Sequence, residues 1–201
     1  MKKITVVGSG YVGLANATML AKNNKVTILD IDGDRVDKIN NRISPLVDAQ
    51  IMDSFQNDDL NLTATLSKKE AYSNPDWVII ATPTDYCPET NYFNTRTVED
   101  CIAEAMWNHI DWDNAETHIV IKSTIPIGFV DSLNTDRVFF SPEFLREGTA
   151  LRDCLRPERI VVGNQDQAGV DWVELMYDSV IQNFPMPPVT YCGNREAESV
   201  K

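Results

Sequence analysis

The sequence predicts an α/β protein with a doubly wound, mostly parallel sheet and helices on both faces. Short β-branched runs alternate along the chain with segments of helical periodicity. A glycine-rich turn follows the first of these runs, and an acidic residue, Asp30, ends the second. Because strand and helix segments alternate, we expect crossover connections and a mostly parallel sheet.

The strand candidates are short apolar runs that end at polar or turn-forming residues. They cover residues 4–7, 26–29, 62–65, 77–81, 119–121, 138–140 and 160–162.

The helix candidates carry apolar residues at a spacing of three or four. They cover residues 11–22, 35–39, 97–110 and 171–180. Helical character also begins at residues 195–201, where the chain stops. We therefore expect one domain over residues 1–195, the start of a linking helix over 196–201, and a truncated chain.

Composition narrows the function class. The net charge of −12 argues against nucleic acid, because phosphate binding needs clustered Lys and Arg. No apolar run approaches the roughly 20 residues of a membrane span, and the start of the chain lacks a secretory signal, so a cytoplasmic protein without a membrane partner is expected.

The cysteine and histidine content argues against a metal centre. There are two His, and no C-x-x-C pair among Cys87, Cys101, Cys154 and Cys192. We expect unbridged thiols in a reducing compartment.

The turn Gly8-Ser-Gly-Tyr-Val-Gly13 has the pattern of a Rossmann-like dinucleotide loop. Gly8 permits the tight turn, Gly10 the approach of a pyrophosphate, and Gly13 close packing of the helix on the strand. Asp30 at the next strand end would accept the ribose hydroxyls and repel a 2′-phosphate, which favours NAD over NADP. Arg35 is interpreted as a neighbour of the adenine or as a local counter-charge. For the glycine loop itself, the alternatives are FAD as the cofactor and a turn that binds no ligand.

Two further strand ends carry hydroxyls and a proline. These are Ala81-Thr-Pro-Thr84 and Lys122-Ser-Thr-Ile-Pro126. Ligands in open α/β sheets bind at this edge, so we expect these segments to line the cofactor; capping or turn chemistry is the alternative.

The stretch Ser141-Pro-Glu-Phe-Leu-Arg-Glu-Gly148 follows a buried strand. Glu143 and Glu147 are four residues apart, which on a helical turn places both carboxylates on one face at the mouth of the sheet. A solvated helix face is the alternative.

These motifs together resemble bacterial UDP-glucose 6-dehydrogenases over nearly the whole chain. The matching segments are the glycine loop to Leu14, Thr82–Tyr86, Thr90–Asn94, Lys122–Thr124, Ser141–Gly148, Thr149–Leu151 and Arg159–Gly163. The dehydrogenases of GDP-mannose and of UDP-N-acetylhexosamines share the glycine loop but match residues 82–94 less well.

The resemblance implies oxidation of C6 of UDP-glucose to UDP-glucuronate with two NAD, through a cysteine thioester. Thr124 would position a water, Glu147 would act as base or electrostatic partner, and Lys201 would stabilise negative charge on the sugar oxygen. The implied NAD contacts are Gly8, Gly10, Tyr11, Val12, Gly13, Asp30, Arg35, Thr82, Pro83, Thr84, Thr124 and Glu147. The implied substrate contacts are Glu143, Phe144, Leu145, Arg146, Glu147 and Lys201.

This chain departs from the family pattern in three respects. The family's nucleophilic cysteine lies beyond Lys201, and the setting of Cys192 does not match it. The family's central dimerisation helix and UDP-binding domain also follow Lys201, so the fragment is expected to bind NAD without completing the oxidation, which a homodimeric full-length parent would perform. Arg152 and Arg156 replace residues that are often aromatic or uncharged. A dehydrogenase of another nucleotide sugar and a non-catalytic NAD-binding module remain open.

Overall fold

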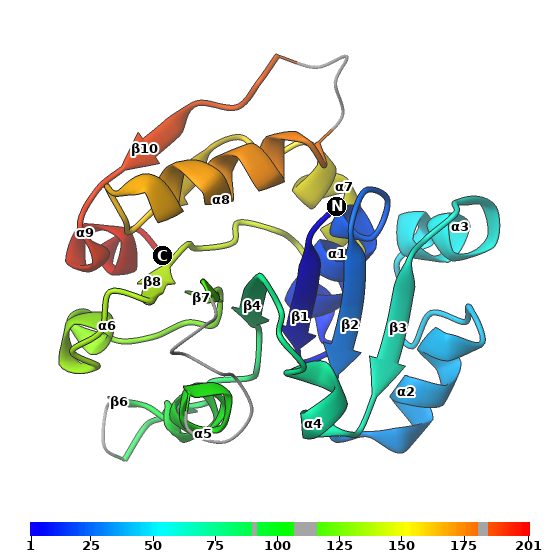
Figure 1. Ribbon diagram of the computed structural model, residues 1–201, viewed down its shortest axis with the longest axis horizontal. Coiled ribbons are helices and arrows are strands. Elements are labelled where there is room, and N and C mark those ends of the chain that lie inside the picture. Colours follow the sequence, from blue (N-terminus) through cyan, green and yellow to red (C-terminus); the bar gives the residue numbers. More distant parts are fainter. Residues whose placement is uncertain (90–91, 107–115, 181–184) are drawn as a thin grey trace.

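The computed structural model describes residues 1–89, 92–106, 116–180 and 185–201. Its centre is a sheet of six strands in the order β3-β2-β1-β4-β7-β8, all paired in parallel (Figure 1). The bounds are β1 (Lys3–Val7), β2 (Lys25–Leu29), β3 (Leu62–Thr65), β4 (Trp77–Ile80), β7 (His118–Ile121) and β8 (Val138–Phe140). Counted among themselves, the strands have the doubly wound order 3-2-1-4-5-6, which confirms the predicted fold class.

The described helices include all four that the sequence predicts, with shifted bounds. They are α1 (Tyr11–Leu20), α2 (Gly33–Asn40), α5 (Arg96–Glu104) and α8 (Gln167–Tyr177). Residues 107–110 of the expected third helix lie outside the described residues. Further helices are α3 (Ala49–Asn57), α4 (Lys68–Ala71), α6 (Phe129–Ser132), α7 (Ala150–Leu155) and α9 (Asn194–Ser199).

Helix α3 shows why a short helix escapes a search for periodicity. Only Ile51, Ser54 and Phe55 are buried along it, so its apolar stripe is brief. Its start is fixed by Asp48, whose side chain accepts the backbone N–H groups of Gln50 and Ile51. The N-cap at Asp48 therefore fixes the start of a helix whose apolar pattern is too short to be recognised.

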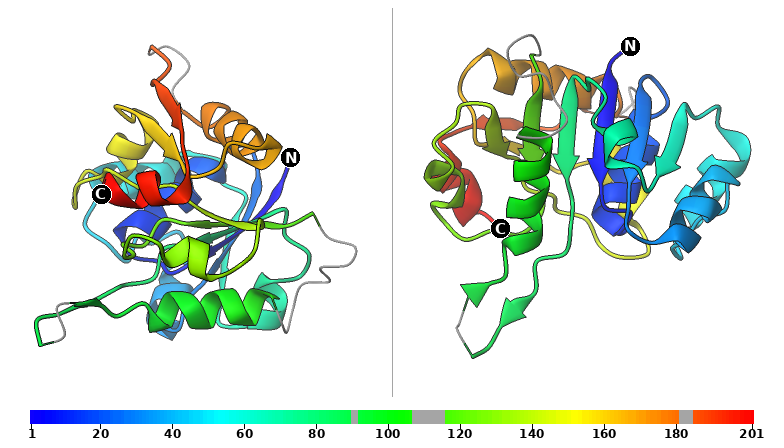
Figure 2. Two further views of the ribbon diagram at one scale, coloured as in Figure 1. Left: turned by 90° about the vertical axis from the view of Figure 1, so that its left-hand side faces the viewer. Right: turned by 60° about the horizontal axis from the view of Figure 1, so that its bottom comes forward.

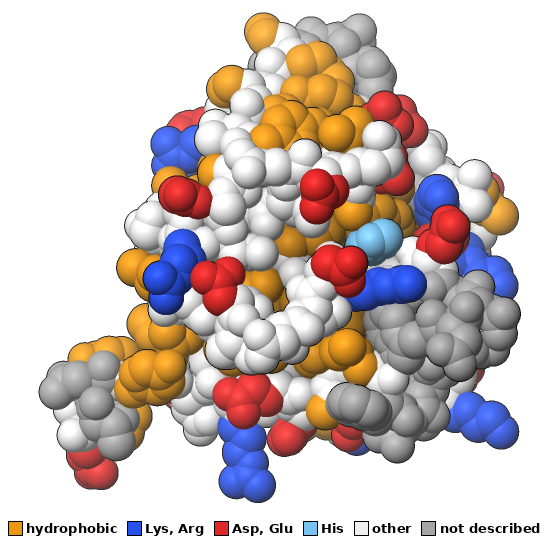
Figure 3. Space-filling view, turned by 60° about the vertical axis from the view of Figure 1, so that its left-hand side comes forward, with side chains coloured by type: hydrophobic (Ala, Val, Ile, Leu, Met, Phe, Trp, Pro, Cys, Tyr) orange, Lys and Arg blue, Asp and Glu red, His pale blue; other side chains and the backbone are white. Residues whose placement is uncertain are grey.

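The described residues also form two small sheets. The strand over residues 160–162 forms as predicted, as β9 (Ile160–Val162), and pairs in parallel with β10 (Val189–Tyr191). The antiparallel pair β5 (Tyr86–Cys87) and β6 (Tyr92–Phe93) forms an arm that projects from the body of the domain (Figure 2). Hydrophobic side chains cover part of this arm (Figure 3).

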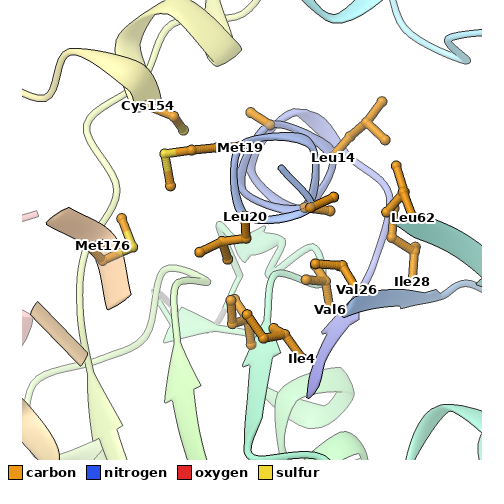
Figure 4. Packing of buried hydrophobic residues seen from close by; sticks show 14 of the residues in the cluster. Ile4, Val6, Leu14, Met19, Leu20, Val26, Ile28, Leu62, Cys154 and Met176 are labelled. Atoms are coloured by element: carbon orange, nitrogen blue, oxygen red, sulfur yellow. The ribbon is translucent and has the colours of Figure 1, made fainter. Parts of the chain in front are cut away.

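The core has one layer on each face of the sheet. On one face, Leu14 and Leu20 of α1 pack with inward residues of β1, β2 and β3 (Figure 4). Met19 lies near Cys154 of α7, so α1 is enclosed between the sheet and a further layer of helix. On the other face, α5 and α6 cover β4 and β7. Helices therefore lie on both faces, as predicted.

The last helix is anchored to the domain. The side chain of Asn194 accepts the backbone N–H of Phe140 in β8 (2.9 Å). Glu198 is 3% exposed and accepts the N–H groups of Gly128 and Val130 at the start of α6. The helix begins at Asn194, close to the expected boundary; the assignment of residues 196–201 to a linking helix stays a prediction.

None of the four cysteines, all within the described part of the chain, forms a disulfide. Within the described residues, no helix combines the length and apolar character that crossing a bilayer requires.

Candidate functional site

The glycine loop lies at the carboxyl end of β1, between strand and α1. Gly8 has φ of +96°, and a Cβ there would lie 2.8 Å from the carbonyl oxygen of Ala81. A Cβ on Gly13 would lie 1.9 Å from the carbonyl oxygen of Gly8. These two positions therefore need glycine for the turn and for close packing.

Gly10 has a different environment, because a Cβ there would meet no atom within 4 Å. It is the N-cap of α1 and no side chain caps the helix. The first N–H groups of α1, from Tyr11, Val12 and Gly13, have no acceptor within the helix, and they carry the positive end of its dipole. The loop thus offers open space and backbone donors, which fits a pyrophosphate.

Asp30 directly follows β2 and lies beside this loop. One carboxylate oxygen accepts both the backbone N–H and the hydroxyl of Ser9, and the other accepts the N–H of Asp32 at 3.0 Å. Partial burial would raise the pKa of Asp30, but these hydrogen bonds lower it overall. The carboxylate of Asp30 is therefore ionised and oriented by hydrogen bonds, and it can still accept hydrogen bonds from ribose hydroxyls.

Arg35 crosses the loop. Its guanidinium donates to the carbonyl of Ser9 (3.2 Å) and lies 3.5 Å from a carboxylate oxygen of Asp32. Arg35 thus places a positive charge beside Asp32, and its contact with NAD stays a prediction.

Sequence reasoning missed two apolar residues beside Asp30 and Arg35. Ile31 is 96% exposed directly after Asp30, and Leu66 is 55% exposed directly after β3. Leu66 lies near Gly33, whose Cβ would be 3.9 Å from its Cδ1. The sequence signal was a large apolar residue directly after Asp30 and another directly after the third strand candidate.

The ends of β4 and β7 meet at the same edge of the sheet. The hydroxyl of Ser123 donates to the carbonyl of Thr82 (2.7 Å), and the hydroxyl of Thr97 donates to the carbonyl of Pro83 (2.8 Å). The hydroxyl of Thr82 is buried and has no hydrogen-bond partner in the described structure. A buried unpaired hydroxyl is costly, so it marks a place where a ligand could bind. Thr84 and Thr124 are partly buried nearby in the chain.

The expectation that Glu143 and Glu147 share a helical face is wrong. Residues 141–146 have no regular structure, and Glu147 begins the turn before α7. Ser141 is held by two bonds, from its N–H to Ile121 and from its hydroxyl to Val161, which keep the segment extended beside the sheet. Glu147 is exposed, whereas the side chain of Glu143 is 10% exposed.

Glu143 instead belongs to a buried polar group. Its Oε2 accepts from Lys122 Nζ at 3.1 Å and from Asn16 Nδ2 at 2.9 Å. Lys122 is 2% exposed, and its ammonium lies 5.5 Å from the centre of the Trp172 ring. Trp172 in turn donates to the hydroxyl of Ser141 (3.2 Å). Sequence reasoning missed Asn16 as a site residue; the signal was a lone amide among apolar residues of α1.

Lys201 reaches this group from the end of the chain. Its ammonium donates to the backbone carbonyl of Lys122 (3.1 Å). Burial and the charge of Lys122 lower the pKa of Lys201, against the opposing effect of Glu143. The structure therefore brings together Glu143 and Lys201, which are far apart in the sequence, but gives Glu147 no hydrogen bond among the described residues.

A cavity of about 450 Å³ opens beside Glu143. Four arginines line it, together with Phe144, Asp153, Pro157 and Glu158; they are Arg146, Arg152, Arg156 and Arg159. Arg146 is clamped by Asp153 in a two-point contact (3.0 and 2.7 Å), and Arg159 lies 4.5 Å from the centre of the Phe144 ring. In a chain of net charge −12, such a cluster suits an anionic ligand. The side chain of Leu145 packs against the core, and the predicted contact of its backbone with the substrate stays a prediction.

A larger cavity, of about 820 Å³, opens at the opposite edge of the sheet. Trp77 and His118, the first residues of β4 and β7, line it with several acidic residues. Ligands of open α/β sheets bind at the carboxyl ends of the strands, so its size does not make it the site.

Comparison with known proteins agrees with this geometry. The family model described as "UDP-glucose/GDP-mannose dehydrogenase family, NAD binding domain" matches residues 2–181. The UDP-glucose 6-dehydrogenase of Campylobacter jejuni is 42% identical over 99% of this chain and 50% of that protein. The UDP-glucose 6-dehydrogenase of Streptococcus pneumoniae is 46% identical over 80% of this chain and 41% of that protein.

Solved structures show the same fold. A ternary complex of GDP-mannose dehydrogenase from Pseudomonas aeruginosa superposes with a TM-score of 0.84 at 24% identity, covering 100% of this chain and 48% of the other. A UDP-glucose dehydrogenase from Pyrobaculum islandicum gives 0.80 at 26% identity, covering 100% and 48%. The chain thus spans about half the length of the curated relatives it matches.

Proposed function

Since the chain belongs to the UDP-glucose/GDP-mannose dehydrogenase family as its NAD-binding domain, we propose that it is the NAD-binding half of a UDP-glucose 6-dehydrogenase. The observation that carries the proposal is the glycine loop with Asp30. Gly10 leaves open space at the start of α1, and the carboxylate of Asp30, oriented by its hydrogen bonds with Ser9, lies beside the loop. Together they provide for the pyrophosphate and for one ribose of the same dinucleotide.

Asp30 also decides between the two nicotinamide cofactors. A 2′-phosphate would bring its negative charge against a carboxylate that hydrogen bonds keep ionised. NADP therefore binds more weakly than NAD.

NAD, when bound, supplies the hydride acceptor for oxidation of a primary alcohol. Tyr11 and Val12 contribute backbone at the loop, and Thr82, Pro83, Thr84 and Thr124 line the same edge of the sheet. The unpaired hydroxyl of Thr82 supports this placement, because a ligand there would satisfy it.

For the chemistry of the sugar, Lys201 would stabilise negative charge on the reacting oxygen, since it already lies at the end of β7. Thr124 would position a water and Glu147 would act beside it. Because Glu147 is exposed, this role requires the turn at 147–148 to face the bound ligand.

The nucleotide sugar would lie along Glu143, Phe144 and Arg146. The arginine-lined cavity supports this, because a diphosphate carries the charge that guanidinium groups bind best. We propose UDP-glucose as the sugar nucleotide because the proteins from C. jejuni and S. pneumoniae carry that name.

The whole protein would be a cytoplasmic homodimer, with no nucleic-acid or membrane partner. Cys101, Cys154 and Cys192 are poor candidates for the nucleophile of the thioester step, because burial raises the pKa of each thiol.

Calorimetric titration with NAD and then NADP, on the chain and on Asp30→Ala, tests the proposal. We expect NAD to bind, NADP to bind weakly, and the variant to lose NAD. A folded chain without affinity for NAD would contradict the cofactor site. Oxidation of UDP-glucose by the full-length protein tests the substrate; NAD binding without turnover of UDP-glucose, GDP-mannose or a UDP-N-acetylhexosamine would indicate a non-catalytic module instead.

A further inference from the structure

Helix α9 presents a buried carboxylate to the segment that follows β7. Glu198 is 3% exposed, and each of its two carboxylate oxygens accepts one backbone N–H. The donors are Gly128 (2.5 Å) and Val130 (2.9 Å), at the start of α6. Figure 1 shows α6 and α9 near one another at the β8 end of the sheet. A carboxylate suits this place because glutamine, which has the same shape, offers only one acceptor oxygen.

The burial of Glu198 is costly in itself. A carboxylate that leaves water needs hydrogen bonds or a basic partner in exchange for its hydration. Glu198 forms no salt bridge with a lysine or arginine of the described residues, and Arg195 on the same helix pairs with Asp131 instead (3.1 Å). The compensation that the described residues provide is therefore the pair of backbone hydrogen bonds, and the role of Glu198 depends on what these two bonds fix in place.

The segment that they fix is the Thr124 loop, residues 123–128. At the start of this loop, the hydroxyl of Ser123 donates to the carbonyl of Thr82 (2.7 Å). At its end, the N–H of Gly128 donates to Glu198. Thr124 is partly buried between these two anchors. The loop is thus fastened to β4 at one end and to α9 at the other.

The end of α9 also directs Lys201 toward the start of this loop. Lys201 follows Glu198 by three residues, and the N–H of Val200 still donates to the carbonyl of Ala197, so the backbone keeps its helical course up to the residue before Lys201. The ammonium of Lys201 donates to the carbonyl of Lys122 (3.1 Å), directly before the Thr124 loop. About one turn of helix therefore contacts the segment 122–130 at two points.

We propose that Glu198 is a positioning residue, which fixes the end of α9 against the Thr124 loop and thereby places Lys201 beside Thr124. The proposal rests on the proposed function, which gives Lys201 its role at the reacting sugar oxygen. In this role Glu198 contacts neither the sugar nor the cofactor, and it transfers no proton. It acts through Lys201.

The alternative is a contact that only stabilises the docking of α9. Loss of Glu198 would then lower the stability of the protein but would leave the turnover of folded protein unchanged. The start of α9 has an anchor of its own, because the side chain of Asn194 accepts the N–H of Phe140 in β8 (2.9 Å). A change at Glu198 should therefore release the end of the helix while its start stays docked. The two interpretations differ in the activity of a folded variant.

The test measures oxidation of UDP-glucose by the full-length protein and by its Glu198→Gln variant, well below the Tm of each. We expect kcat to fall at least about tenfold and KM for UDP-glucose to change by less than about threefold, because Lys201 acts on charge that develops only in the transition state. Glu198→Asp, which keeps both acceptor oxygens, takes the place of Glu198→Gln if that variant does not fold, with a loss of at least about threefold. A kcat within about twofold of the original overturns the proposal.

A double-mutant cycle identifies the residue through which Glu198 acts. Lys201→Met alone should lower kcat more than Glu198→Gln does. Glu198→Gln added to Lys201→Met should then lower kcat by less than about threefold more, because the group that Glu198 positions is already absent. The same fold loss from Glu198→Gln with and without Lys201 would show that Glu198 does not act through Lys201, and would overturn the proposal.

Two variants on the same helix are matched controls. Arg195→Met removes the exposed pair with Asp131, a second contact between α9 and α6. Glu196→Gln makes the same chemical change as Glu198→Gln at an exposed residue. Both should leave kcat within about twofold of the original, because exposed charges contribute little. A loss in either control as large as that of Glu198→Gln would mean that any change in α9 disturbs the site, and would overturn the specific role of Glu198.

Hydrogen exchange on the chain itself separates failure of this proposal from failure of the proposed function, because it needs no substrate. In Glu198→Gln, at least one of the amides of Gly128 and Val130 should exchange at least about tenfold faster by NMR, while the amide of Phe140 should be unchanged. Unchanged exchange at both amides overturns the positioning role alone. A full-length protein that does not oxidise UDP-glucose overturns the proposed function, and this role with it.

Discussion

Gly10→Ala and Gly13→Ala add the same methyl group to the same loop, with opposite expected consequences. At Gly13 the new Cβ would lie 1.9 Å from the carbonyl oxygen and 3.0 Å from the carbonyl carbon of Gly8. Both are backbone atoms, so α1 or the turn must move. Overpacking of this kind costs about 1–3 kcal/mol, and the clash places it at the upper end. The better helix propensity of alanine returns about 1 kcal/mol.

The expected net loss for Gly13→Ala is therefore about 2 kcal/mol. For a domain of this size, that corresponds to a fall in Tm of about 4–8 °C. This measurement tests whether α1 packs closely on the turn at Gly8.

At Gly10 the added methyl meets no atom within 4 Å, and φ of −69° suits alanine. Alanine is a poorer N-cap than glycine by up to about 1 kcal/mol. The reduced entropy of the unfolded chain offsets this by about 0.4–1 kcal/mol. Tm should stay within about 3 °C of the starting protein.

NAD binding should separate the two variants further. The methyl of Gly10→Ala occupies the approach of the pyrophosphate, and we expect Kd for NAD to rise at least about tenfold, which is 1.4 kcal/mol. Thermal unfolding and calorimetric titration on both variants measure these effects. A Gly13→Ala protein as stable as the original, or a Gly10→Ala protein with unchanged NAD affinity, would refute the reasoning.

Three further outcomes are expected. Asp30 and Glu143 have pKa values below their ordinary values of 3.8 and 4.5, so the stability that these carboxylates contribute is complete above those values and is lost as pH falls through the lower pKa values of the folded state. The midpoint of urea unfolding should therefore stay constant from about pH 7 to about pH 5 and fall at lower pH. A midpoint that stays constant down to about pH 3 would contradict this. Trp172→Phe removes a buried donor to Ser141 and should cost about 1–3 kcal/mol in urea unfolding; no loss would show that this hydrogen bond contributes nothing. Burial raises the pKa of the Cys154 thiol, so a disulfide reagent at pH 8 should label it far more slowly than the partly exposed Cys192, and equal labelling detected by mass spectrometry would show that α7 opens readily.

The parts of the fold that follow a repeating pattern could be predicted from the sequence. All seven strand candidates form, because each is an apolar run that the sheets bury. Short helices such as α3 could not be predicted in the same way, because the cap at Asp48 fixes the start and tertiary contacts supply the stability. The strands β5 and β6 have two residues each, too few to show an alternating pattern.

The candidate site likewise has parts that local sequence motifs predict and parts that depend on tertiary contacts. The glycine loop and Asp30 are local motifs, and their geometry is present where the spacing predicts it. The pairing of Glu143 with Lys122 and Asn16 joins three segments that meet only when the sheet forms, so no spacing rule reveals it. The four-residue spacing of Glu143 and Glu147 led to the wrong prediction of a shared helical face, because hydrogen bonds from Ser141 to Ile121 and Val161 keep the segment extended.

The order of strands in the sheet has a consequence for synthesis on the ribosome. The first strand made, β1, lies between β2 and β4 at the centre. β2 and then β3 can add at one side of it, and β4, β7 and β8 at the other, each at an edge that is open when that strand emerges. No strand needs to enter between two that are already paired. The sheet can therefore grow outward in the order of translation, with the dinucleotide loop beside its oldest strand.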